Sequence, residues 1–267
     1  MIRRFLTYAA AAVLSFGVVT TDADARTFDL AFIMDESGSV GSTNYIAAMD
    51  SLADALETHI DAAVLADDIY NITVVSFADG ANVLVSQTVD SLADLAIVTA
   101  AIRADLHTGG TTNFEAAFDA LLGVGTALTA GADASIINMM TDGVPCCGTS
   151  VSQAGITGAR NDLIGAGWDS LSFEAVGSGP DSTYLAGLGF DSAGTVGGLD
   201  IISDPNDIGN ILTDPFVLEV SGFGTAYDTA IDVKVQSIVA PVPIPATLPL
   251  LAGGFALLGF VGRRRKS

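Results

Sequence analysis

The stretch that decides the fold is residues 28–39, FDLAFIMDESGS, where an apolar run changes abruptly to polar residues. Residues 28–34 supply core-forming side chains, and the loop that follows carries Asp35, Ser37 and Ser39. An apolar run of this length, rich in aromatic and branched side chains, is typical of a buried strand. We therefore predict a core strand that ends in a loop where carboxylate and hydroxyl oxygens converge.

Strand-like and helix-like segments alternate along the rest of the chain. We expect strands at 69–77, 82–86, 135–140, 172–176 and 199–203, and helices at 42–60, 91–106, 114–122, 152–166, 183–188 and 206–212. Strands separated by helix-length segments imply an α/β fold, a doubly wound, mostly parallel sheet with helices on both faces. In such sheets, ligands bind at the carboxyl ends of the strands.

Residues 216–238 fit this alternation less well. Apolar and polar residues alternate across 216–220 and again across 231–238. This pattern leaves two interpretations open, an added pair of strands or an extended neck.

The composition is strongly acidic. The chain has 31 Asp and Glu against 10 Lys and Arg, and the body of the chain holds only Arg26, Arg103, Arg160 and Lys234 among its basic residues. Nucleic acid is therefore excluded as a partner, because its phosphates would be repelled. So acidic a body suits a saline or cation-rich exterior, or simply serves solubility.

Both ends of the chain carry targeting patterns. Two arginines precede an apolar stretch at 9–19, and Ala23 to Ala25 form a small-x-small site, so we predict a signal peptide over 1–25 rather than an N-terminal membrane anchor. A second apolar segment ends in a cluster of basic residues at 263–266, which would keep the C-terminus on the cytoplasmic side of a membrane. The predicted division is a signal peptide at 1–25, a main domain at 26–215, extra strands or a neck at 216–241, and a membrane tail at 242–267.

Three fragments that lie far apart in the sequence point to one metal site. They are Asp35-x-Ser37-x-Ser39, Thr112 within GGTTN, and Asp142 within TDG. Each fragment lies at a predicted strand end or turn, and each supplies carboxylate or hydroxyl oxygens without a converging His or Cys. Such ligands suit a hard divalent cation, Mg²⁺ first, with Mn²⁺ and Ca²⁺ as alternatives.

On these fragments, residues 27–213 resemble the von Willebrand factor A (VWA, integrin I-like) family. The resemblance implies a doubly wound sheet with a metal-ion-dependent adhesion site. Thr112 is preferred over Thr111 because the family pattern places a small–apolar pair five and six residues later, here Ala117-Phe118. We expect Glu36 to face solvent beside the site. The metal ligands that the resemblance implies are Asp35, Ser37, Ser39, Thr112 and Asp142.

The individual fragments also have simpler interpretations. Ser37 and Ser39 could cap a helix, and Asp142 could belong to an ordinary turn, although neither role excludes metal binding. Cys146 and Cys147 are the only cysteines and follow the Asp142 loop. In an oxidising exterior we favour a disulfide between these neighbours, with free or intermolecular thiols as the alternative.

The tail resembles the VPxPA variant of the PEP-CTERM sorting signals of Gram-negative bacteria. The motif is Val242-Pro243-Ile244-Pro245-Ala246, followed by the apolar segment and the basic terminus. The resemblance implies recognition by an exosortase-type membrane protease and an association with exopolysaccharide and biofilm. The alternative is an uncleaved membrane anchor.

Together these expectations describe an exported binding protein of the cell surface or matrix rather than an enzyme. The sequence has no HExxH motif and no phosphate loop. The cation would complete its coordination with a carboxylate from an extracellular protein or an acidic polysaccharide. Two alternatives remain, an extracellular assembly scaffold in which the metal only holds the loops, and an envelope hydrolase.

Overall fold

The structure is a computed structural model that describes residues 25–124, 131–146 and 152–239. The membrane tail with its sorting motif, and all but the last residue of the predicted signal peptide, lie outside the described residues. Within the described part of the chain, no helix is long and apolar enough to cross a membrane.

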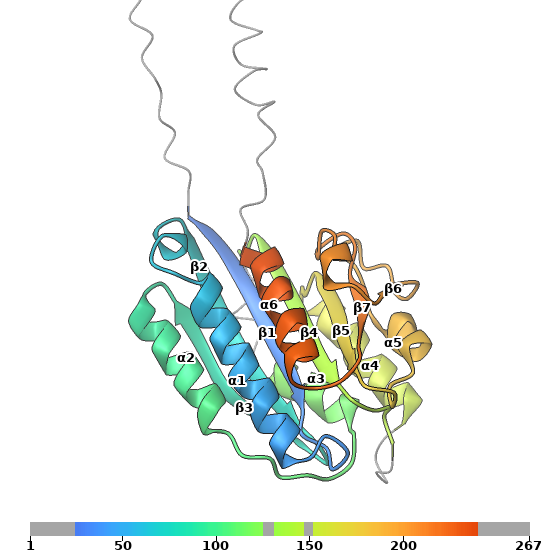
Figure 1. Cartoon of the computed structure of the whole chain (residues 1–267). Coiled ribbons are helices and arrows are strands. Elements are labelled where there is room, and N and C mark those ends of the chain that lie inside the picture. Colours follow the sequence, from blue (N-terminus) through green and yellow to red (C-terminus); the bar gives the residue numbers. More distant parts are fainter. Residues whose placement is uncertain (1–24, 125–130, 147–151, 240–267) are drawn as a thin grey trace, which may run out of the picture.

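One seven-stranded sheet forms the centre of the molecule (Figure 1). Its strand order is β3-β2-β1-β4-β5-β7-β6, and only β3 runs antiparallel to its neighbour. The α/β fold with a mostly parallel sheet is therefore confirmed. The strands are β1 (Arg26–Asp35), β2 (Asp68–Phe77), β3 (Ala81–Val89), β4 (Ala134–Thr141), β5 (Ser170–Val176), β6 (Asp200–Ile202) and β7 (Phe216–Val220).

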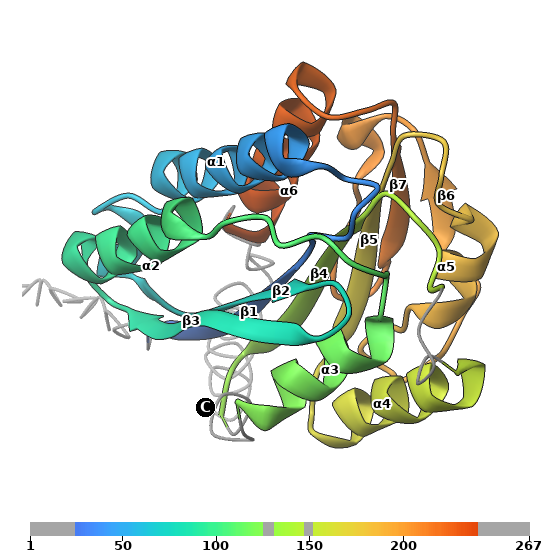
Figure 2. The same cartoon turned by 90° about the horizontal axis from the view of Figure 1, so that it is seen from below.

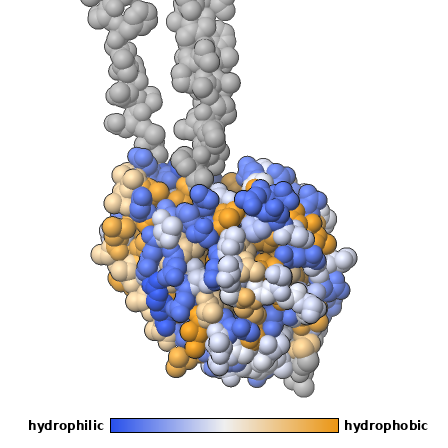
Figure 3. All heavy atoms as spheres, in the orientation of Figure 1, coloured by the Kyte–Doolittle hydropathy of each residue, from blue (hydrophilic) through white to orange (hydrophobic). Residues whose placement is uncertain are grey.

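Helices cover both faces of the sheet (Figure 2). One core cluster contains residues of α1, α2 and α6, and the other contains residues of α3, α4 and α5. Hydrophilic and hydrophobic residues are interspersed on the face that carries α1 and α6 (Figure 3). The helices are α1 (Ser42–His59), α2 (Leu92–Ala104), α3 (Phe114–Gly123), α4 (Gln153–Gly165), α5 (Ser182–Leu188) and α6 (Thr225–Val239), with short 3₁₀ turns η1 (Val64–Ala66) and η2 (Pro205–Asp207).

The central strand β1 is apolar because it is buried from both sides. Leu30, Phe32 and Met34 face one group of helices, whereas Ala31 and Ile33 face the other. Hydrogen bonds to β2 and β4 flank the strand along most of its length. Each fully buried large side chain contributes about 1.5–3 kcal/mol, so β1 holds the two layers together and fixes where its last residue lies.

Two expectations for the C-terminal part of the chain are wrong. Residues 206–212 do not form a helix, because the structure has only the 3₁₀ turn η2 there. Residues 231–238 are neither strand nor neck, because they belong to α6, which packs on α1. With β7 inserted between β5 and β6, the layered fold extends to residue 239 and does not end at the predicted boundary, residue 215.

A buried ion pair holds α6 on the sheet. Lys234 Nζ lies 2.6 Å from Glu174 Oε1, and neither side chain is exposed to solvent. The ammonium group also lies 4.8 Å from the centre of the Phe216 ring. Burial lowers the pKa of Lys234, and the neighbouring carboxylate opposes that shift. Each charge is therefore tolerated in the core only because the other is present.

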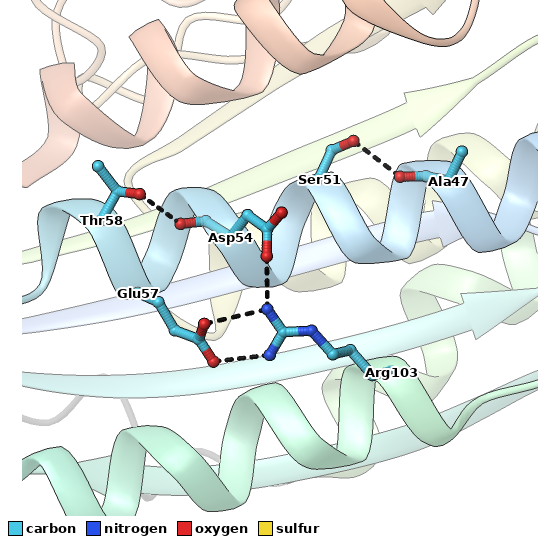
Figure 4. A network of polar contacts seen from close by, with 6 residues as sticks. All are labelled: Ala47, Ser51, Asp54, Glu57, Thr58 and Arg103. Carbon is cyan, nitrogen blue, oxygen red and sulfur yellow. Dashed lines mark hydrogen bonds and ion pairs between the residues drawn. The ribbon is translucent and has the colours of Figure 1, made fainter.

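A second, exposed ion-pair network joins α1 to α2 (Figure 4). The Arg103 guanidinium contacts Asp54 at 2.5 Å and Glu57 at 2.6 Å. Hydrogen bonds to these carboxylates raise the pKa of Arg103. Because all three side chains are partly solvated, removing one partner of this network should cost far less stability than removing one partner of the buried pair.

Breaking the Lys234–Glu174 pair from one side should destabilise the fold. Lys234→Met leaves a buried carboxylate without a cation, and we expect the free energy of unfolding in urea to fall by about 3–5 kcal/mol. The double variant Lys234→Met/Glu174→Leu removes both charges and should recover most of that loss. A double variant no more stable than the single one would contradict this account.

Candidate metal centre

The first loop begins where β1 ends, and its carboxylate is held from two sides. Asp35 is fully buried. Its Oδ1 accepts a hydrogen bond from the Ser37 amide at 2.8 Å, and its Oδ2 accepts one from the Thr141 hydroxyl at 2.6 Å. Thr141 directly precedes Asp142, but no sequence pattern marks its hydroxyl as a partner of Asp35. Both contacts fix the orientation of the carboxylate before any ligand is bound.

Two serine hydroxyls connect the first loop to the third. Ser37 Oγ and Ser39 Oγ lie 3.2 Å apart, and Ser39 Oγ donates a hydrogen bond to Asp142 Oδ1 at 2.7 Å. Asp142 directly follows β4, the neighbour of β1 in the sheet. Side chains from two parallel strand ends therefore meet at one edge, as the topology requires.

The second loop, GGTTN, places Thr112 beside the other two. The Gly38 amide donates to the Gly110 carbonyl at 3.0 Å, which joins the first loop to the second. Thr112 Oγ1 lies 3.6 Å from the position that a Cβ on Gly143 would occupy. The Thr112 carbonyl accepts a hydrogen bond from the Cys146 amide at 3.2 Å. The structure thus brings all five predicted ligand residues to the carboxyl edge of the sheet.

The expectation that Glu36 faces solvent is wrong. The Glu36 amide continues the β1 ladder by donating to the Phe77 carbonyl at 2.9 Å, and the side chain is only 2% exposed. Its Oε2 accepts a hydrogen bond from the Thr108 amide at 2.8 Å. His107 Nε2 lies 3.1 Å from the Ser37 carbonyl and donates to it. These contacts hold His107 and Thr108, the residues that lead into the second loop, against the first loop.

Sequence reasoning missed these contacts because they join residues about 70 positions apart. No local pattern marks such a pair. The predicted cysteine pair is in part outside the described residues. Cys146 is disulfide-bonded, whereas Cys147 is not described, so the pairing of these neighbours stays a proposal.

The electrostatics of the site favour a cation. Burial, with a smaller contribution from the nearby Asp142 carboxylate, raises the pKa of Asp35 to about 6, although the hydrogen bonds from Ser37 and Thr141 oppose this shift. Burial also raises the pKa of Asp142. Among the described residues, no Lys or Arg forms an ion pair with either carboxylate. Two carboxylates and three hydroxyl side chains without a protein cation match the oxygen donor set of Mg²⁺ or a similar ion.

The part of the chain that forms these loops is similar to a known protein family. Residues 30–144 match the family model of the von Willebrand factor type A domain. Over this range the chain is similar to a VWA domain. That range begins within β1 and ends just after Asp142, so it covers all three loops of the candidate metal centre. None of the curated proteins matches the chain.

Solved structures show the same fold. A von Willebrand factor type A protein from Catenulispora acidiphila has a TM-score of 0.55 at 18% identity, covering 81% of this chain and 42% of that one. Proximal thread matrix protein 1 from the mussel byssus has a TM-score of 0.52 at 15% identity, covering 80% and 47%. The pilus adhesin SpaC from Lactobacillus rhamnosus GG, in its open conformation, has a TM-score of 0.52 at 10% identity, covering 80% and 30%. The chain spans less than half the length of each of these proteins.

In the absence of metal, the stability of the folded domain should depend on pH through Asp35. Its pKa of about 6 in the folded state lies above the ordinary 3.8. The folded state therefore favours the protonated carboxyl, and this contribution to stability is full below about pH 4 and is lost as the pH rises through about 6. Asp35→Asn mimics the protonated form. With chelator present, we measure the difference in the free energy of unfolding between Asp35→Asn and wild type. We expect this difference to shift in favour of the variant by about 2–3 kcal/mol from pH 4 to pH 7. A difference that stays constant across that range would contradict the burial argument.

Proposed function

We propose that this protein is an exported binding protein that captures an acidic group of its partner through a divalent cation. The observation that carries the proposal is the convergence of three loops at one sheet edge. Asp35, Ser37, Ser39, Thr112 and Asp142 would hold the cation, directly or through water. A bound Mg²⁺, or Mn²⁺ or Ca²⁺ in its place, would supply a positive charge with a coordination position open to a carboxylate.

The protein's own residues supply the preorganisation. Hydrogen bonds from Ser37 and Thr141 hold the Asp35 carboxylate in place. Contacts of Glu36 and His107 hold the segment that leads into the second loop against the first loop. Neutral hydroxyls make up most of the donor set, and a carboxylate that acts through water neutralises the ion less than one bound directly, so the open coordination position would still attract an acidic partner. The mussel matrix protein with a zinc-occupied MIDAS motif and the pilus adhesin support this class of function.

The position of the chain ends fits display on a surface. β1 begins and α6 ends at the same end of the molecule, the upper end in Figure 1. The parallel strands run away from that end, so the loops of the candidate metal centre lie at the opposite one. A protein tethered through its C-terminal tail would therefore present the loops outward.

We further propose that the chain is exported through the signal peptide 1–25 and sorted through the VPxPA motif at 242–246. An exosortase-type protease would process the tail in the inner membrane of a Gram-negative bacterium, leaving the protein at the cell surface or in a biofilm matrix. A disulfide between Cys146 and Cys147 would stiffen the rim of the third loop. The function is binding and not catalysis.

Removing the third-loop carboxylate should abolish metal-dependent adhesion. We expect Asp142→Ala to reduce binding of the protein to surface polysaccharide and secreted proteins to the level seen with chelator, because both changes remove the cation. The matched control is Asp119→Ala, which removes an exposed carboxylate on α3. Adhesion that survives Asp142→Ala while thermal stability falls would favour the scaffold function, and turnover of a surface polymer would favour a hydrolase.

Processing of the tail can be read directly by mass spectrometry of secreted protein. We expect a mature C-terminus that lacks Arg263 to Lys266, because the basic cluster stays on the cytoplasmic side. Secreted protein that retains those residues would exclude cleavage.

A further inference from the structure

A groove between α4 and α5 leads away from the third loop. One cavity, of about 420 Å³, begins at Val144 and Pro145, directly after the TDG turn, and a second, of about 290 Å³, reaches Arg160. The two cavities share Gln153 and Tyr184 as lining residues. The two cavities therefore adjoin and are treated as one groove, whose near end begins two residues after Asp142 of the candidate metal centre.

Arg160 is unusual among the basic residues of the described chain. Arg26, Arg103 and Lys234 each form an ion pair with a carboxylate, whereas Arg160 forms none with any described residue. It is nevertheless only 7% exposed. In so acidic a protein, a nearly buried guanidinium without a carboxylate is a place where an anion from outside can bind.

The known contacts of Arg160 leave part of the guanidinium free for such a ligand. Nη1 donates to the Leu188 carbonyl at 3.2 Å and Nε donates to the Asn161 side chain at 3.0 Å. No described residue accepts a hydrogen bond from the remaining terminal nitrogen. Burial lowers the pKa of Arg160, yet a guanidinium stays charged at any physiological pH.

Apolar residues such as Ile156, Leu188 and Val196 also line the groove, and its other polar groups are largely neutral. Gln153 Nε2 lies 3.5 Å from Thr157 Oγ1, a weak contact that a better acceptor could replace. The Tyr184 hydroxyl is buried, and Gln153 is the one described residue whose side chain interacts with it by hydrogen bonding. The one carboxylate, Asp181, lines the part nearer the metal loop and is already bound to the Tyr184 amide at 3.0 Å. Amide and hydroxyl groups match the hydroxyl-rich surface of a sugar.

We propose that this groove is a second carboxylate subsite, in which Arg160, with Gln153 and Thr157, binds a uronate residue of an acidic polysaccharide. A uronate polymer carries one carboxylate per sugar, so a second carboxylate of the same chain can reach the metal. That two-point attachment rests on the proposed function of the metal centre, whereas the Arg160 subsite does not need the metal. Two linked contacts bind far more tightly than either alone.

The test is the binding of a fluorescent galacturonate oligomer to the full-length chain in detergent, measured by anisotropy with Mg²⁺ and with chelator. We expect Arg160→Met to weaken binding about tenfold or more in Mg²⁺ and to remove the residual binding in chelator. Thr157→Glu, one helical turn before Arg160, should do the same by pairing with the guanidinium while leaving the α5 contact intact. Arg103→Met removes an equal charge elsewhere and should bind like wild type.

Several outcomes would overturn the subsite. They are an Arg160→Met protein that binds like Arg103→Met, a wild-type protein that does not bind the oligomer, and a glutamate oligomer that binds as tightly as the uronate. The subsite and the metal centre fail separately in this design. If only Asp142→Ala and chelator weaken binding, the subsite is wrong, and if only Arg160→Met and Thr157→Glu do so, the metal-dependent function is wrong.

Discussion

The structure depends on one constraint, a carboxylate buried at the end of the central strand. Asp35 is placed there because β1 is buried from Phe28 to its last residue and pairs in register with β2 and β4. Burying a carboxylate without a cation is unfavourable. Hydrogen bonds from Ser37 and Thr141 offset part of that cost, and a divalent ion would offset the remainder. The same Asp35 side chain therefore ends the central strand and, in the proposed function, helps to bind the cation.

The layers around β1 explain why three distant loops can act together. Parallel strands direct their carboxyl ends to one edge of the sheet. Contacts of Glu36 and His107 also connect the first loop to the segment that leads into the second loop. The α6 helix is held by a buried Lys234–Glu174 pair rather than by apolar packing alone. The edge that carries the loops is thus supported by contacts spread over the whole sheet.

Much of this arrangement could be predicted from local sequence. The apolar run before Asp35 and the TDG turn at Asp142 each combine a strand with its first polar residue, so the fold and the residues that meet at the edge of the sheet could be predicted. The α6 helix could not be predicted in this way, because Asp228, Asp232 and Lys234 interrupt its apolar pattern. Lys234 is buried only because a carboxylate 60 residues earlier pairs with it. Glu36 was misjudged for the same reason, since its partner is distant in sequence.

The central claim is that the three loops together bind one divalent cation, and the most direct measurement is a titration of the full-length chain with Mn²⁺ followed by electron paramagnetic resonance. The account predicts about one tightly bound ion per chain, and loss of that ion when Ser39, Thr112 or Asp142, one from each loop, is replaced by alanine. Wild-type protein that binds no ion, or weak binding that none of the three substitutions changes, would contradict it.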